Sequence, residues 1–132
     1  MGSHHNGINL GLSYIAAVLK KESYNVRIYN ADYYDSNEYI NQRQIFGNYD
    51  AYKKIINDLA DPIWAEIKEN IVKFNPDIIG ITMFTANYKV AKVMAKIAKG
   101  FNDNIKIIVG GVHPTIDPEG TLKKFVIGLQ KM

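Results

Sequence analysis

The 132-residue sequence contains no cysteine and no long apolar run. Without cysteine, the chain cannot form a disulfide, a thiolate zinc site or a cysteine-ligated iron–sulfur cluster, and it has no cysteine nucleophile. No apolar run approaches the ~18 residues that a membrane span needs, and no signal-peptide pattern follows the start. We therefore predict a soluble, cytoplasmic protein that does not contact a membrane.

The sequence also has no segment in which positive or negative charge is concentrated. The chain has 16 Lys and Arg against 13 Asp and Glu, which gives a net charge of +3. The lysines are distributed over several helical segments, whereas a nucleic-acid-binding protein usually has a concentrated basic stripe. We expect no nucleic-acid partner. With 47% hydrophobic and 22% charged residues, the composition is that of an ordinary globular chain, and its length predicts one domain over residues 1–132.

Hydrophobic periodicity predicts an alternation of helices and strands. Helical spacing of apolar residues favours helices over 11–22, 50–59, 62–74 and 87–99, with Gly100 as the C-cap of the last. Short apolar runs favour strands over 26–29, 78–82 and 106–109, with 125–127 as an edge strand.

This alternation predicts an α/β fold, in which a parallel sheet carries helices on both faces. In the flavodoxin-like order the first strand lies inside the sheet. Here the first regular segment is the helix at Gly11, so the first strand is missing from its expected position. Either the chain is a truncated piece, or another segment fills that place in the sheet. Residues 1–5 resemble part of an expression tag; a truncated natural loop is the alternative. If the neighbouring strands lack this partner, we expect them to pair directly, or with a second copy in a homodimer formed by strand exchange.

Ligands of open parallel sheets bind beyond the carboxyl ends of the strands. The candidate residues therefore follow the strands over 78–82 and 106–109. They are Thr82, Met83, Phe84, Thr85, Gly110, Gly111 and His113. The simpler interpretations are that Thr85 or Asn87 caps a helix and that the glycines form a tight turn. We identify no catalytic set and no metal-ligand set in the chain.

Three blocks together resemble a known family: GLSYIAAVLKKESYNVRIYNAD, FNPDIIGITMFTANYKVAKVMAKIAK and IKIIVGGVHPTIDPEG. They are similar to the cobalamin-binding domain at the front of radical S-adenosylmethionine enzymes. Relatives include the anaerobic magnesium-protoporphyrin monomethyl ester cyclase type and cobalamin-dependent methyltransferases. The resemblance runs from about Gly7 to Gly120, most of the chain.

The resemblance implies a flavodoxin-like domain that holds cobalamin base-off. Thr82, Met83 and Phe84 match the family's Ser-x-Leu pattern, and Gly110-Gly111 match its glycine pair. These small or hydroxyl-bearing residues would admit the nucleotide tail between sheet and helices. The parent enzyme would bind S-adenosylmethionine and an iron–sulfur cluster in a separate radical domain, so this chain alone would not be catalytic.

Three departures from the family pattern stand out. Of the cobalt-ligating Asp-x-His-x-x-Gly motif, only His4 and Gly7 match; Ser23 stands where the family has glycine; and no Gly-Glu-Gly-Glu follows residues 126–128. The domain is therefore expected to be incomplete at both ends. The alternatives are a cofactor-free flavodoxin-like regulatory or interaction domain, and a fragment that folds but binds nothing. A bulky residue at Gly111 is expected to block the cofactor slot and to affect folding less.

Overall fold

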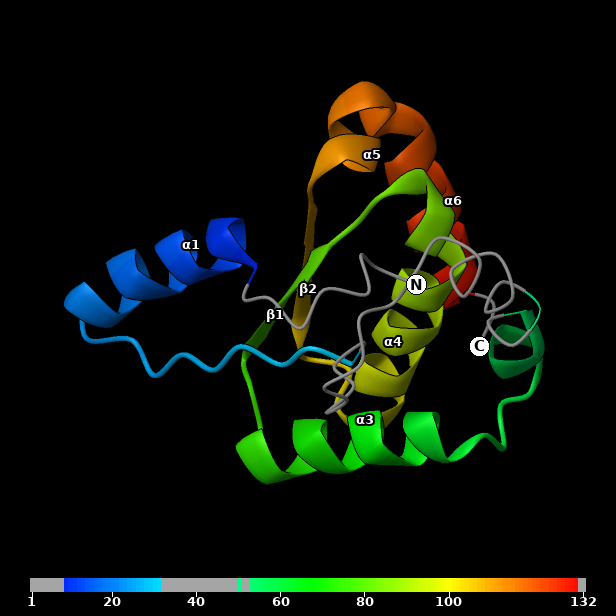
Figure 1. Ribbon diagram of the computed structural model, residues 1–132, viewed down its shortest axis with the longest axis horizontal. Coiled ribbons are helices and arrows are strands. Elements are labelled where there is room, and N and C mark those ends of the chain that lie inside the picture. Colours follow the sequence, from blue (N-terminus) through cyan, green and yellow to red (C-terminus); the bar gives the residue numbers. More distant parts are fainter. Residues whose placement is uncertain (1–8, 32–49, 51–52, 131–132) are drawn as a thin grey trace, which may run out of the picture. The chain divides into compact units, whose positions relative to one another are not determined.

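The computed structural model describes residues 9–31, 50 and 53–130 (Figure 1). Its internal contacts divide the chain into two compact units, Met1–Gly47 and Asn48–Met132, and each unit is described by itself. The single domain expected over residues 1–132 stays a prediction. None of the described helices is both long and apolar enough to cross a membrane.

The first unit contains helix α1, Leu10–Lys21, which confirms the helix predicted over 11–22. Asn9 caps its start, since the Asn9 Oδ1 accepts a hydrogen bond of 3.1 Å from the Leu12 N–H. The strand predicted over 26–29 is wrong, because residues 24–30 have no regular secondary structure. A strand needs a partner for its backbone groups, and the described part of this unit offers no other strand.

In the second unit, residues 53–57 are helical, and they lie within the helix predicted over 50–59. Helix α3, Pro62–Phe74, has the predicted bounds. The Asp61 side chain caps its start, and Asn75 ends it in the left-handed conformation at φ 47°. Trp64 is 5% exposed, and its indole N–H donates to the Ile55 and Asp58 carbonyls at 3.0 and 3.1 Å. The indole therefore fastens the preceding segment onto α3.

Strands β1, Ile78–Thr82, and β2, Lys106–Gly110, form a parallel pair in the centre of this unit (Figure 1). Ile78 lies opposite Lys106, and Thr82 lies opposite Gly110. The parallel pairing that the apolar runs predict is confirmed for these two strands. The short 3-10 turn η1, Thr85–Asn87, and helix α4, Tyr88–Phe101, connect them.

Helix α4 covers one face of the strand pair through small residues. Ala91, Ala95 and Ala98 are at most 2% exposed, and the first two belong to one core cluster with Ile81 and Met83. Their small side chains allow a close approach of helix and sheet. The prediction that Gly100 caps α4 is wrong, because the helix continues to Phe101 and its C-cap is Asn102.

Helices α5, Val112–Ile116, and α6, Pro118–Gln130, follow β2. The edge strand predicted over 125–127 is therefore wrong. The Asp117 Oδ1 accepts a hydrogen bond of 3.0 Å from the Gly120 N–H at the start of α6. Thr121 and Phe125, four residues apart, are 1% and 5% exposed, so Phe125 continues a buried helix face rather than a strand.

Tyr88 joins α4 to α6. Its ring meets Phe125 edge to face at a centroid distance of 5.8 Å. The Tyr88 hydroxyl is buried and makes no hydrogen bond to the described residues, and the same holds for the Thr121 hydroxyl. Burial raises the pKa of Tyr88 above its ordinary value of 10.0, and the charge of Asp117 adds to the rise.

We expect Tyr88→Phe to retain more stability than the parent chain in alkaline solution. Because folding raises the pKa of Tyr88, this side chain ionises at a lower pH in the unfolded chain than in the folded one. The parent chain therefore loses stability as pH rises past 10. Phenylalanine cannot ionise. Urea unfolding at pH 7 and above pH 10 measures the difference, with Tyr14→Phe as the control, since Tyr14 is 74% exposed. Equal alkaline losses in Tyr88→Phe and in the parent would contradict the prediction.

Candidate functional site at the carboxyl ends of the strands

The loops that leave β1 and β2 meet at the carboxyl ends of both strands. The Met83 N–H donates to the Gly110 carbonyl at 2.7 Å, and the His113 N–H donates to the Met83 carbonyl at 3.1 Å. These bonds extend the parallel ladder one residue past β1 and tie the second loop to the first. The two loops predicted from the sequence are therefore brought together at one edge.

A side-chain hydrogen bond also joins these loops. The Thr85 Oγ1 lies 2.9 Å from the His113 Nδ1. On its other side, the His113 ring contacts the Tyr88 ring at a centroid distance of 5.3 Å. His113 is thus oriented by two neighbours, and the Nε2 atom is the part of its ring left for another partner.

Gly111 makes the closest backbone approach at this edge. It has φ 99°, and a Cβ atom there would lie 2.9 Å from the Met83 carbonyl oxygen and 3.0 Å from the Thr82 Oγ1. The tight-turn interpretation therefore holds for Gly111. The expectation that a bulky residue at Gly111 would affect folding little is wrong, because any side chain at this position strains the loop itself.

Gly110 and Gly80 differ from Gly111, because a Cβ atom at either would meet nothing within 4 Å. Side chains alternate along a strand, so Gly80, Thr82 and Gly110 share the face opposite the α4 alanines. Near the strand ends, Gly80 and Gly110 therefore leave an open strip of backbone on this face, which Thr82 and Ile108 border. Sequence reasoning missed Gly80, although its position two residues before Thr82 in a strand was a usable signal.

The remaining predicted residues lie in different surroundings. The Met83 side chain is 0% exposed and belongs to the core, so only its backbone takes part in the edge. Phe84 is 50% exposed, and its N–H donates to the Asn87 Oδ1 at 2.7 Å. This bond confirms that Asn87 helps to cap the turn before α4. His4 and the other residues of the opening segment lie outside the described residues.

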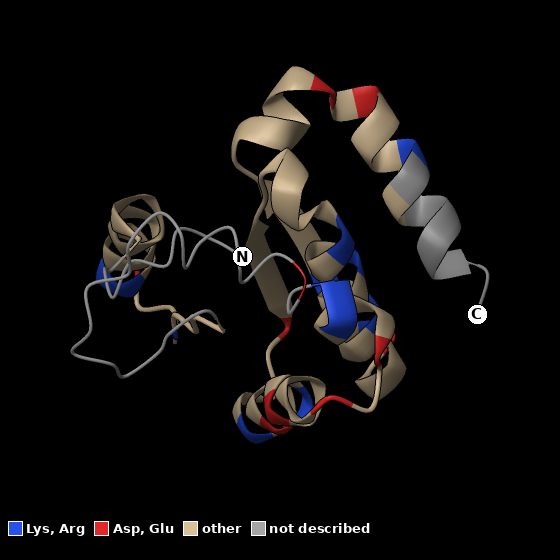
Figure 2. Ribbon diagram, turned by 45° about the vertical axis from the view of Figure 1, so that its right-hand side comes forward, with Lys and Arg blue, Asp and Glu red and all other residues tan. Residues whose placement is uncertain are grey.

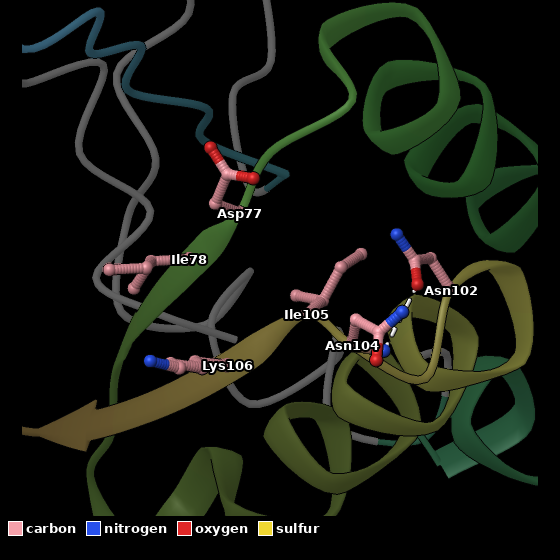
Figure 3. Close-up of a pocket in the computed structure, with 6 residues that line it drawn as sticks. All are labelled: Asp77, Ile78, Asn102, Asn104, Ile105 and Lys106. Atoms are coloured by element: carbon pink, nitrogen blue, oxygen red, sulfur yellow. Dashed lines mark hydrogen bonds between the residues drawn. The ribbon is translucent and has the colours of Figure 1, made fainter.

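A pocket of about 280 Å³ lies at the other end of the strands, where β1 and β2 begin (Figure 3). The residues that line it are Asp77, Ile78, Asn102, Asn104, Ile105 and Lys106. The Asn104 N–H donates to the Asn102 Oδ1 at 3.0 Å, so part of its polar lining is engaged within the loop. Ligands of open parallel sheets bind at the carboxyl ends, and we therefore place the candidate site at the edge near Thr82 and Gly110.

Metal-binding groups do not gather at either end of the sheet. Across residues 9–31, 50 and 53–130, no three His, Asp or Glu side chains come together in a way that could hold a metal ion. What the edge offers instead is a hydroxyl on Thr82, an oriented imidazole on His113 and an open strip of backbone at Gly80 and Gly110. Such a strip suits a flat ligand with polar edges.

Comparison with known proteins gives two relatives. The chain is 43% identical over 72 residues to an uncharacterized methyltransferase of Pyrococcus horikoshii, a match that covers 54% of this chain and 16% of the relative. It is 36% identical over 69 residues to the anaerobic magnesium-protoporphyrin IX monomethyl ester cyclase of Rubrivivax gelatinosus, a match that covers 52% of this chain and 12% of the cyclase. The chain therefore spans less than a fifth of the length of either relative. No solved structure gives a significant match.

The model of one protein family, the B12 binding domain, matches residues 3–130. This match covers nearly the whole chain and includes both strands and the loops that follow them. It agrees with the resemblance found in the sequence, and the cyclase belongs to the type named there. The chain is therefore a member of the B12-binding domain family, with the α/β, flavodoxin-like fold that its sequence predicts.

Proposed function

We propose that the domain binds cobalamin base-off at the carboxyl edge of the sheet, as the cofactor module of a larger radical S-adenosylmethionine enzyme. The observation that supports this most directly is the open strip at Gly80 and Gly110 beside Thr82. A flat nucleotide base needs a slot without large side chains, and its polar edge needs a hydroxyl or backbone partner. The residues present therefore fit the cofactor's nucleotide tail.

Each residue at the edge has a distinct part in this proposal. Gly80 and Gly110 leave room for the tail, and Thr82 offers a hydrogen bond. Gly111 keeps the second loop close to the end of β1. Thr85 orients His113, whose Nε2 atom faces a further polar partner in this proposal. Phe84 adds an exposed apolar surface. Met83 acts through its backbone, because its side chain is buried in the core.

Cobalamin, when bound, supplies a cobalt centre that carries and transfers alkyl groups. The chain contains no cysteine, so the iron–sulfur cluster and S-adenosylmethionine belong in this proposal to a separate domain of the parent protein. The short share of each relative that the chain covers is consistent with such a larger protein. The cytoplasm stays the predicted compartment.

We expect Gly110→Leu to block cobalamin binding without unfolding the domain. A leucine there occupies the open strip, where its Cβ meets no neighbour within 4 Å, and we expect affinity to fall about ten-fold or more from the steric clash with the ligand. Titration with hydroxocobalamin, followed by absorbance, measures this, and Gly80→Val repeats the test from β1.

The matched control is Gly100→Leu. Gly100 also has open space around it, but it lies in α4, away from the strand ends. The Gly100→Leu variant should bind cobalamin like the parent chain. Thermal melts should show that Gly110→Leu, Gly80→Val and Gly100→Leu are all folded. Normal binding by Gly110→Leu would refute the slot. Failure of the parent chain itself to bind cobalamin would refute the proposed function and favour a cofactor-free domain.

A second expectation concerns the Thr82 hydroxyl. Thr82→Val keeps the shape of the side chain and removes its hydrogen-bonding group, so cobalamin binding should weaken by about 0.5–1.5 kcal/mol, roughly 2- to 12-fold. Thr121→Val is the control, because the Thr121 hydroxyl is buried in α6 and makes no hydrogen bond to the described residues. Equal affinity in Thr82→Val and the parent would remove Thr82 from the site.

We also propose that the chain forms a homodimer through its strands. In the described part of the chain, β1 and β2 pair only with each other, so each presents an outer edge of backbone donors and acceptors to a further strand. Sedimentation equilibrium should show a concentration-dependent dimer. A strictly monomeric chain across the whole concentration range would rule out this association.

A further inference from the structure

Four lysines align along helix α4. Lys89, Lys92, Lys96 and Lys99 follow one another at spacings of three and four residues. At 3.6 residues per turn they fall within an arc of about 80° and extend over about 15 Å. Figure 2 shows basic residues along this helix. We call this set the α4 lysine stripe; the sequence-based expectation that lysines do not cluster is wrong for this helix.

The α4 lysine stripe has almost no compensating negative charge. The sequence of α4 contains no Asp or Glu. Lys99 has a partner in Asp103, whose carbonyl and carboxylate oxygens lie 2.6 and 3.8 Å from the Lys99 Nζ. Among the residues that the structure describes, no carboxylate forms an ion pair with Lys89, Lys92 or Lys96.

The arrangement opposes helix stability in two ways. Like charges three and four residues apart repel one another on a helix surface. Lys89 also lies in the first turn of α4, where the helix dipole favours negative rather than positive charge. The isolated domain therefore carries a repulsion that an anionic partner would relieve. Lys92, Lys96 and Lys99 are half-buried, which limits how far their ammonium groups can separate.

The surroundings of the stripe favour one kind of partner. Single-stranded nucleic acid is bound by basic residues together with aromatic platforms, but the aromatic residue beside the stripe, Tyr88, packs against His113 and Phe125. A membrane surface needs exposed apolar residues next to the lysines, and the large apolar residues of α4 other than Phe101 are half-buried. A straight row of cations on a helix instead complements a row of carboxylates on a second helix.

We propose that the α4 lysine stripe is a docking surface for an acidic helix of a partner protein, whose carboxylates repeat at the same three- and four-residue spacing. This surface belongs to a helix face and does not depend on cobalamin. It would give the domain a contact with a protein partner that is separate from the edge near Thr82 and Gly110.

The test uses an alanine-based helical peptide whose glutamates share one face at this spacing. A second peptide of identical composition has its glutamates spread around the helix. Fluorescence anisotropy at low and high ionic strength measures binding of each labelled peptide to the full chain. We expect the one-faced peptide to bind more tightly and its binding to weaken with salt. Equal binding of both peptides, or no binding of either, would overturn the proposal.

The variant is Lys92→Gln with Lys96→Gln, and the matched control is Lys20→Gln with Lys21→Gln, which removes the same charge from α1. We expect the α4 variant to bind the one-faced peptide at least about five-fold more weakly than the parent chain does. Its melting temperature should be no lower than that of the parent. The control variant should bind the peptide like the parent. Equal weakening in both variants, or a lower melting temperature of the α4 variant, would overturn the proposal. So would tighter binding of a poly-dT oligonucleotide through the same lysines.

Discussion

The carboxyl edge of the sheet depends on the close approach of Gly111 to the end of β1. Because this residue has no side chain, its backbone approaches the end of β1 so closely that a Cβ atom there would lie 2.9 Å from the Met83 carbonyl oxygen and 3.0 Å from the Thr82 Oγ1. The same approach lets the His113 N–H bond the Met83 carbonyl. That bond places the imidazole within reach of Thr85. Without Gly111 at φ 99°, the loops would separate and the edge would lose its shape.

The two faces of the strand pair have different roles. On one face, alanines of α4 pack closely on Ile81 and Met83 and form the core. On the other, Ile78 and Ile108 remain 55% and 58% exposed, and the strip at Gly80 and Gly110 is open. Because side chains alternate along a strand, each five-residue strand contributes to the core on one face and to a binding surface on the other.

The sequence predicts those elements whose signals are local and redundant. The strand at Ile78–Thr82 and the helix at Pro62–Phe74 have the expected bounds, because an apolar run or a cap-and-proline start admits one interpretation. The apolar run at 125–127 is too short to distinguish a strand from a helix by its periodicity. The signal for a helix is the Asp117 cap, which lies eight residues before the run. The run at 26–29 depended on a pairing partner, which local pattern cannot supply. At the site, the position of Gly110 and Gly111 directly after a predicted strand identified both residues, but only the backbone geometry distinguishes the open position at Gly110 from the strained one at Gly111.

The single tryptophan of the chain gives the second unit an optical signal of its own. Trp64 is 5% exposed and holds two carbonyls of the preceding segment through its indole N–H. Its emission therefore depends on the packing of that segment against α3. Because the first unit contains no tryptophan, a change in this fluorescence during denaturation reports the loss of structure around the second unit's core, while far-ultraviolet circular dichroism averages over both units.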